Sequence, residues 1–391
     1  MRLAFLTALI PVARPDTGFE IANAAILDAL RFAGHEVTAF GFLRPGETPA
    51  DPEGAVVIAR TDIENAAVAP GRRLRWIIAA LRMGLPVACA KLRIAGAGRL
   101  VEAVRAQGPF DAIILNSVML PGAFPDLLRL GPCVLVEHNI EHVSARQSAA
   151  HARNPVLRRL FNREASLLER MERKLWQEVR FVWTLAQEDR AALGEAHQAK
   201  SAVLPLISNQ RDEPHPMAGG EPEPAHDVGL IGTWTWTPNF IGLDWFLREV
   251  CPLLPSDITV AVAGRLPAGI RSLPPQVKLL GRVPAADAFL RSCRIVALSS
   301  RAGTGVQLKT IEALELGLPA VATTLSCRGF TTMPDNVTRA DTPAEFAKAV
   351  IARVAAIRAG DRQRVDGAAF MALQRVALTE GLERGLAAAR T

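Results

Sequence analysis

The sequence predicts an α/β protein made of two doubly wound domains. Three observations predict it: short apolar runs typical of buried strands alternate with helical patterns, segment 209–227 interrupts that alternation, and the alternation restarts directly after it. The interrupting segment is dense in proline, glycine and charge, which is typical of a linker. A chain of 391 residues is long enough for two buried cores. We therefore expect an N-terminal domain over 1–208, a linker over 209–227 and a C-terminal domain over 228–372. We also expect a C-terminal helix over 373–391 that can pack back toward the N-terminal domain.

The first domain opens with a strand, helix and strand. The apolar run Leu3–Ile10 also resembles a short signal peptide, but a first core strand is the better interpretation, because a glycine turn and the helix Glu20–Phe32 follow it. Further strands are expected at Glu36–Phe40, Val56–Ala59, Ala112–Asn116, Val134–Glu137 and Phe181–Thr184.

The second domain repeats this pattern from Val228 onward. Its expected strands are Val228–Gly232, Thr259–Ala263, Val277–Leu280, Ile295–Leu298 and Ala320–Thr323. Two doubly wound domains are expected to face one another. Ligands of such sheets bind beyond the carboxyl ends of the strands, here in the cleft between the domains.

Composition excludes several classes of protein. The five cysteines form no Cys-x-x-Cys pair and no metal-ligand spacing, which predicts a reducing, cytoplasmic setting. No apolar run approaches the roughly 20 residues of a membrane span. The net charge of +6 comes mostly from arginine, yet tyrosine is absent and no basic stretch is interleaved with aromatic residues, so nucleic acid is not an expected partner.

Segment 299–324 carries the clearest functional signal. Gly303 and Gly305 allow close approach of the backbone to a ligand, and the helix expected to open near Val306 turns unpaired N–H groups toward that loop. This order favours phosphate binding. Lys309 and Glu312 are three apart and share one helix face, with Lys309 suited to a phosphate and Glu312 to sugar hydroxyls. A Rossmann fingerprint would need glycine at Leu308, and the Gly-Lys-Ser/Thr of a P-loop is absent.

The same segment resembles the donor site of group 1 glycosyltransferases of family 4. The matching residues are Gly303, Gly305, Val306, Lys309, Glu312, Ala313, Gly317 and Pro319. The resemblance implies the GT-B fold, with two Rossmann-like domains and a nucleotide-diphosphate sugar as donor substrate. It implies that the loop Gly303, Thr304, Gly305, Val306 and Gln307 binds the diphosphate, and that Glu312 binds the ribose.

Further matches extend along the second domain. Gly232 opens a loop similar to the family's first donor-domain loop. Arg265 resembles the arginine that clamps the diphosphate, and Arg282 with Val283 resembles the segment near the nucleobase. Arg282 is equally well interpreted as a surface charge. The family's second acid, eight residues before the helix glutamate, is Thr304 here, and its common lysine is Ile270, so the donor sugar stays open.

The first domain contributes three candidates. His138 follows the strand Val134–Glu137 and resembles the histidine that approaches the donor sugar; the alternative is a histidine satisfied within a loop. Gly18 and Phe19 resemble the flexible first loop of the family. His138 and His142 are four apart, but a third ligand at metal spacing is missing, so no metal site is expected.

Together these features predict a glycosyltransferase acting on a glycan or lipid-linked acceptor in cell-envelope or exopolysaccharide synthesis. Its catalytic residues would be His138, Arg265 and Lys309. Retention of configuration is implied by the resemblance, and metal independence is expected because side chains and N–H groups can stabilise the leaving diphosphate. Two alternatives stay open: a GT-B nucleotide-sugar epimerase or hydrolase, and a non-catalytic two-lobed sugar-binding protein.

One segment predicts contact with a membrane. Arg72, Arg73, Arg75 and Arg82 alternate with apolar residues in a short amphipathic pattern. Docking at an anionic surface on the inner face of the cell membrane and ordinary packing against the domain are the two interpretations.

Overall fold

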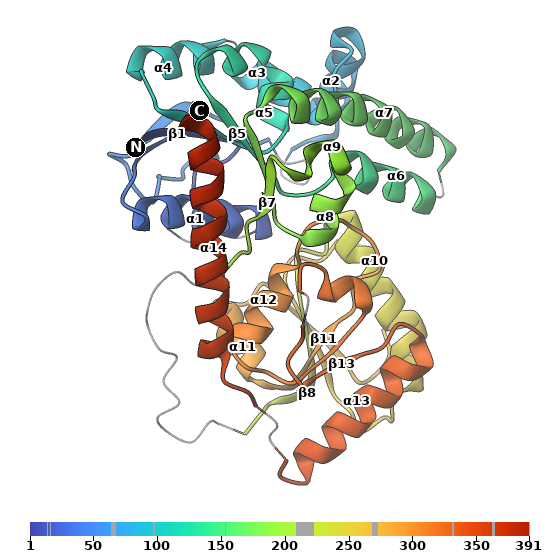
Figure 1. The fold of residues 1–391 in the computed structure, drawn as a ribbon. Coiled ribbons are helices and arrows are strands. Elements are labelled where there is room, and N and C mark those ends of the chain that lie inside the picture. Colours follow the sequence, from blue (N-terminus) through green and yellow to red (C-terminus); the bar gives the residue numbers. More distant parts are fainter. Residues whose placement is uncertain are drawn as a thin grey trace. The chain divides into compact units, whose positions relative to one another are not determined.

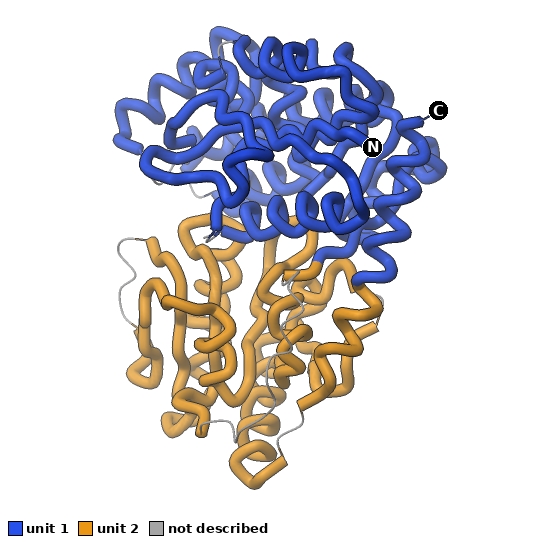
Figure 2. The backbone as a smooth tube through the Cα atoms, turned by 90° about the vertical axis from the view of Figure 1, so that its left-hand side faces the viewer, with its two compact units in different colours: residues 1–206, 375–391 blue, residues 207–374 orange. Residues whose placement is uncertain are grey.

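The computed structural model describes residues 1–13, 15, 17–63, 68–96, 98–152, 154–208, 223–267, 273–330, 332–361 and 364–390. The chain divides into two compact units, which Figure 2 colours separately. Unit 1 contains residues 1–206 and 375–391, and unit 2 contains residues 207–374. Most of the segment expected as a linker, 209–222, lies outside the described residues, as does Ile270.

Unit 1 is built on a seven-stranded parallel sheet in the order β3-β2-β1-β4-β5-β6-β7. The strands are β1 (Arg2–Thr7), β2 (Glu36–Leu43), β3 (Ala55–Arg60), β4 (Ala112–Asn116), β5 (Cys133–Glu137), β6 (Phe181–Thr184) and β7 (Ser201–Val203). The helices are α1 (Gly18–Phe32), α2 (Pro70–Met83), α3 (Val87–Gly96), α4 (Arg99–Gln107), α5 (Met119–Ala123), α6 (Glu141–His151), α7 (Pro155–Glu178), α8 (Gln187–Ala192) and α9 (Glu195–Gln198), with a 3-10 turn, η2, at Pro125–Arg129 (Figure 1).

Unit 2 has a six-stranded parallel sheet in the order β10-β9-β8-β11-β12-β13. The strands are β8 (His226–Ile231), β9 (Val260–Ala263), β10 (Val277–Gly281), β11 (Cys293–Leu298), β12 (Ala320–Ala322) and β13 (Val337–Arg339). The helices are α10 (Thr237–Trp245), continued by η3 (Phe246–Val250) and η4 (Cys251–Leu253), then α11 (Ala286–Arg291), α12 (Leu308–Glu315), η5 (Thr324–Cys327) and α13 (Pro343–Arg358). The last helix, α14 (Gly367–Arg390), begins in unit 2 and ends in unit 1.

The alternation of side chains along the strands builds two cores in unit 2. In β9, Val260 and Val262 belong to one cluster, which includes Phe246 and Phe346. Ala261 and Ala263 belong to the cluster on the opposite face, which includes Leu290 and Ala313. Apolar side chains cover both faces of this sheet. Its strands are therefore continuous apolar runs in the sequence, as is typical of buried parallel strands.

The expected fold class is confirmed, since both units are doubly wound parallel α/β structures. Some boundaries differ. β1 ends at Thr7 rather than Ile10, α1 begins at Gly18 rather than Glu20, and β8 begins at His226, inside the expected linker. Among the described residues, no helix combines the length and the hydropathy that crossing a bilayer requires.

Candidate functional site

The loop between β11 and α12 needs both of its glycines. Gly303 has φ +107° and Gly305 has φ +76°, values that residues with a side chain rarely adopt. The helix that follows begins at Leu308, slightly later than expected, and its N-cap residue Gln307 makes no capping side-chain bond. Thr304 and Gln307 are buried, and Val306 is half-buried.

Buried hydroxyl groups fix this loop to the next strand connection. The Ser300 N–H donates to Ser326 Oγ at 3.0 Å, and Thr323 Oγ1 donates to the Ser300 carbonyl at 2.6 Å. Thr310 Oγ1, from α12, donates to the Ser326 carbonyl at 2.8 Å. Since satisfied buried polar networks are rigid, the loop is held in place before any ligand arrives. Sequence reasoning missed Ser326, because its partners are distant in the chain.

Lys309 lies on the first turn of α12, and its side chain is half-buried. Its Nζ is 3.4 Å from Asn239 Oδ1 and 5.6 Å from the centre of the Trp234 ring. Burial lowers the pKa of Lys309 to about 8. A desolvated ammonium of this kind gains stability when an anion binds beside it.

Glu312 lies one turn further along α12. Burial, and then the negative charges of Glu315 and Asp287, raise the pKa of Glu312 to about 7. Its carboxylate is therefore also poorly stabilised in the free protein. A ligand that places an anion beside Lys309 and hydroxyl donors beside Glu312 would stabilise the charges of both side chains.

The loops after β8, β9 and β10 are bonded to one another. The Gly232 N–H donates to the Ala263 carbonyl at 3.2 Å, and the Gly264 N–H donates to the Gly281 carbonyl at 2.6 Å. Gly264 has φ +112°, and a Cβ there would lie 1.9 Å from the Gly232 carbonyl oxygen. Close backbone contact at this edge of the sheet therefore requires glycine.

Three more predicted residues lie at this edge. The Arg265 carbonyl accepts a bond of 2.9 Å from the Trp234 N–H, and the arginine side chain is exposed. Arg282, just after β10, is also exposed, whereas Val283 packs against the core. The residues predicted in the second domain thus gather at the carboxyl ends of the unit 2 strands.

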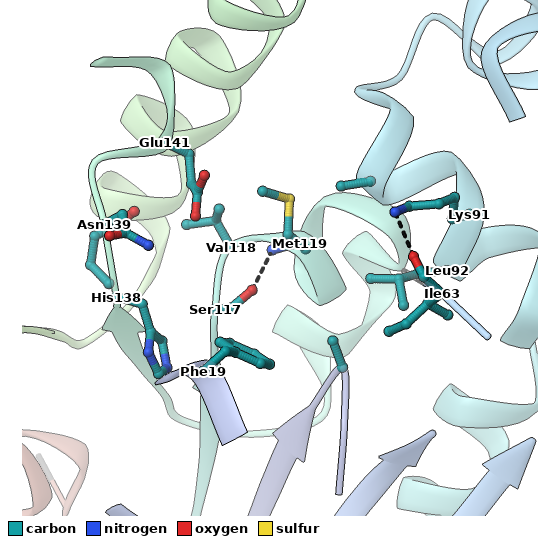
Figure 3. Close-up of a pocket in the computed structure, with 13 residues that line it drawn as sticks. Phe19, Ile63, Lys91, Leu92, Ser117, Val118, Met119, His138, Asn139 and Glu141 are labelled. Atoms are coloured by element: carbon teal, nitrogen blue, oxygen red, sulfur yellow. Dashed lines mark hydrogen bonds between the residues drawn. The ribbon is translucent and has the colours of Figure 1, made fainter. Parts of the chain in front are cut away.

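His138, Gly18 and Phe19 belong to unit 1. Gly18 and Phe19 are in the first turn of α1, whose start is capped by Thr17 and Glu20, so they are helical rather than loop residues. The Phe19 and His138 rings are 5.0 Å apart. Both line a cavity of about 140 Å³ at the carboxyl ends of the unit 1 strands (Figure 3).

This cavity combines apolar walls with buried polar groups. Ile63, Leu92, Val118 and Met119 form apolar walls, and Ser117, His138 and Glu141 add polar groups (Figure 3). Burial lowers the pKa of His138 to about 4, and burial together with the Glu172 charge raises the pKa of Glu141 to about 8. Both groups are therefore mostly neutral near pH 7.

Backbone strain also occurs at this cavity. Ser117 has φ +115°, and its Oγ accepts a bond of 3.1 Å from the Met119 N–H. Positive φ in a residue with a side chain is uncommon and concentrates at functional sites. Neither Ser117 nor Glu141 was predicted as a site residue, although polar residues after apolar strands were a usable signal. Within the described ranges, no group of three His, Cys, Asp or Glu side chains is placed to hold a metal ion.

The second unit matches a known protein family. Residues 225–355, most of unit 2, match the family model described as glycosyl transferases group 1. No curated protein sequence matches the chain significantly.

Solved structures resemble the whole chain. Sucrose-phosphate synthase from Thermosynechococcus elongatus has 13% identity and a TM-score of 0.64, with 98% of this chain and 96% of that chain covered. HepE from Anabaena, solved with UDP and glucose, has 16% identity and a TM-score of 0.59, with 99% of each chain covered. WaaG, a glycosyltransferase involved in lipopolysaccharide biosynthesis, has 14% identity and a TM-score of 0.59, with 98% of each chain covered.

At these identities the structural likeness shows the fold, and the family match identifies the domain that carries the glycine loop, Lys309 and Glu312. The chain has the GT-B fold of these solved structures, and its residues 225–355 match the family of group 1 glycosyl transferases.

Proposed function

We propose that the protein transfers a sugar, with retention and without a metal ion, from a nucleoside-diphosphate donor to a glycan or lipid-linked acceptor. The observation that carries the donor assignment is the placement of Lys309 and Glu312 beside the rigid loop of Gly303 and Gly305. A nucleoside diphosphate carries both groups in one ligand: its diphosphate can bind Lys309, and its ribose hydroxyl groups can bind Glu312. HepE, which was solved with UDP and glucose, makes UDP-glucose the first donor to test.

Transfer breaks the bond between the anomeric carbon and a phosphate oxygen, which leaves negative charge on the diphosphate. We assign the stabilisation of that charge to Lys309, Arg265 and the N–H groups of the loop up to Gln307. In the retaining reaction the acceptor oxygen bonds to the anomeric carbon on the face from which the diphosphate leaves. The acceptor proton passes to the departing phosphate oxygen, so no carboxylate nucleophile is needed.

For the acceptor, we propose the cavity beside His138 in unit 1. Its apolar walls and the mostly neutral Glu141 suit a hydroxyl-bearing group, and we assign His138, which also lines the cavity, to a hydroxyl group of the donor sugar. WaaG acts in lipopolysaccharide biosynthesis, which supports a role in making envelope or exopolysaccharide. We also propose a peripheral position at the inner face of the cell membrane, because α2 exposes apolar and basic side chains to solvent.

Substitution of Glu312 tests the donor site. If the carboxylate binds the ribose, Glu312→Ala should weaken UDP binding by about 1.5–3 kcal/mol, the range for a hydrogen bond to a charged group. Glu312→Gln keeps the shape and should be milder. The matched control is Glu249→Ala, which removes an exposed glutamate of the same unit. Isothermal titration calorimetry measures all three, and unchanged UDP affinity in folded Glu312→Ala would overturn the donor assignment.

Chelation tests the metal independence. We expect transfer to continue at an unchanged rate in excess EDTA, because the proposal assigns the work of a cation to side chains and backbone N–H groups. Product formation is followed by chromatography with and without the chelator. Loss of activity that added Mg²⁺ or Mn²⁺ restores would contradict this part of the proposal.

A further inference from the structure

A buried chain of hydrogen bonds links the ends of two strands and one residue of helix α1 in unit 1 to His138. Its members are Thr7, which ends β1, Asn23 of α1, Asn116, which ends β4, and His138, which follows β5. The first three are fully buried, and His138 is 8% exposed. His138, the last member of the chain, lines the cavity that Figure 3 shows.

The direction of the chain is fixed at its start. The carbonyl oxygen of Leu9 can only accept hydrogen bonds, and it lies 3.1 Å from Asn23 Nδ2 and 3.1 Å from Thr7 Oγ1. Asn23 must therefore turn its NH₂ group toward Leu9 and Thr7, because the reversed amide would set two acceptors against each other. Its Oδ1 consequently points to Asn116, whose Nδ2 is 2.6 Å away.

This orientation determines the next amide and then the imidazole. Asn116 Nδ2 donates to Asn23 Oδ1 and, at 3.3 Å, to Thr7 Oγ1. Its Oδ1 is left facing His138 Nε2, at 2.7 Å. An amide oxygen only accepts, so the hydrogen of this bond belongs to His138 Nε2.

We propose that Asn116 is a positioning residue that holds His138 as the tautomer protonated at Nε2. The tautomer does not depend on the proposed function. Only the role of His138 toward the donor sugar rests on the proposed function. In this tautomer the single N–H of the ring is committed to Asn116, and Nδ1 is an acceptor. A ring in this tautomer can accept a hydrogen bond from a sugar hydroxyl group through Nδ1, whereas a phosphate oxygen would need a second N–H donor.

The tautomer can be measured without any ligand. The test uses the full-length protein labelled with ¹⁵N-histidine and a long-range ¹H–¹⁵N correlation spectrum at neutral pH, with the His138 signals identified by their loss in His138→Gln. We expect the pattern of a ring protonated at Nε2. In Asn116→Leu, which removes the acceptor, the pattern should shift toward Nδ1 protonation or become a mixture.

Asn162→Leu is the matched control, because Asn162 is exposed on α7 and outside the chain of bonds. It should leave the His138 signals unchanged. A wild-type ring protonated at Nδ1 would overturn the proposal without recourse to any variant. An unchanged pattern in folded Asn116→Leu would overturn it as well.

Binding separates this proposal from the assignment of the donor. Asn116→Leu should lower the affinity for UDP-glucose about tenfold, the loss of roughly one hydrogen bond, and should leave the affinity for UDP within about twofold. Equal losses for both ligands would overturn the role toward the sugar. If the wild-type protein bound neither UDP nor UDP-glucose, the proposed function would be contradicted. The tautomer would still be decided by the NMR spectrum alone.

Discussion

At the scale of single residues, the surroundings of Lys309 support the proposed diphosphate site. Its ammonium lies against an indole ring and an amide oxygen, and burial lowers its pKa to about 8. A lysine on a solvated helix face would keep a pKa near 10.4. The surroundings therefore disfavour the charge that this residue carries, and a diphosphate bound beside Lys309 would stabilise that charge.

This gives a pH dependence with a definite sign. Below about pH 8, Lys309 is already protonated and UDP affinity should not depend on its titration. Above that pH, binding must also take up a proton, so affinity should fall by up to about tenfold per pH unit. Calorimetry between pH 7 and pH 10 measures this limb.

Lys309→Arg is the matched variant, because a guanidinium stays charged throughout that range. Its affinity should be flat where the wild type declines, whatever its absolute value. A wild-type affinity that stays constant up to pH 10 would show that Lys309 does not face the diphosphate.

Residue spacing predicted part of the site and could not predict the rest. Lys309 and Glu312 lie on one short helix, so their common face follows from helix geometry. The bond between Asn116 and His138 joins the ends of two different strands, and it depends on the register of β4 against β5. Periodicity carries no information on register, so Asn116 was not predicted as part of the site.

At the scale of elements, α2 presents apolar side chains to solvent. Leu74, Ile78 and Leu81 follow helical spacing on one face and are 57%, 39% and 56% exposed. Trp76 and Ala80, on another face, are buried. Arg75 and Arg82 each follow a residue of the apolar stripe and are exposed beside it. This pattern is typical of a helix at a membrane surface.

The structure changes which arginines should matter for docking. Arg72 lies over the Trp76 ring at 5.3 Å and donates to Thr61 Oγ1, so part of its role is packing. Arg75→Glu with Arg82→Glu should abolish binding to vesicles containing phosphatidylserine, because each basic residue near such a surface contributes about 1 kcal/mol. Co-sedimentation at low and high salt measures the binding.

The control for that experiment is Arg170→Glu with Lys348→Glu, which makes the same change in net charge at exposed positions on α7 and α13. The control should bind vesicles nearly as well as the wild type. Equal binding by both double variants would remove α2 from the docking surface.

The C-terminal helix α14 packs through glycine. The Trp183 Nε1–H donates to the Gly381 carbonyl at 2.7 Å, and a Cβ at Gly385 would lie 2.4 Å from the Trp183 ring. The two glycines are four apart, so they share the face that lies against β6. Contact this close leaves no room for a methyl group.

Gly385→Ala should therefore destabilise unit 1 although alanine favours helix. Overpacking costs about 1–3 kcal/mol, against a gain of at most about 1 kcal/mol in helix propensity. Gly71→Ala is the control, since no atom lies within 4 Å of a Cβ there, and it should be neutral or stabilising. Urea unfolding followed by circular dichroism compares the two, and equal stability would contradict the packing described.

The two strands that the sequence did not predict are both short. β7 and β13 have three residues each, too few to show a pattern of alternation. They form the last strand of each sheet, next to β6 and β12. Longer strands such as β4 were located correctly because five consecutive buried residues leave a continuous apolar run.

At the scale of the whole molecule, the two units differ in how the chain builds them. Unit 2 is one continuous stretch, whereas unit 1 is made from both ends of the chain. Composition and periodicity predicted two doubly wound sheets, because each sheet is encoded locally by alternating strands and helices. A C-terminal helix that can pack back toward the N-terminal domain was expected from the sequence, but its contact with Trp183 joins residues 198 positions apart, which local patterns do not encode.

This division has a consequence for biosynthesis. In unit 1 the indole N–H of Trp183 donates to the carbonyl of Gly381, 198 positions later in the chain. The ribosome must therefore translate past residue 381 before that bond can form. During synthesis, all residues of unit 2 have been added to the chain before the last residues of unit 1. A premature stop codon or a proteolytic cut just before Arg375 therefore spares the residues of unit 2 and uncovers the core of the N-terminal unit, where Leu378, Leu382 and Leu386 are buried.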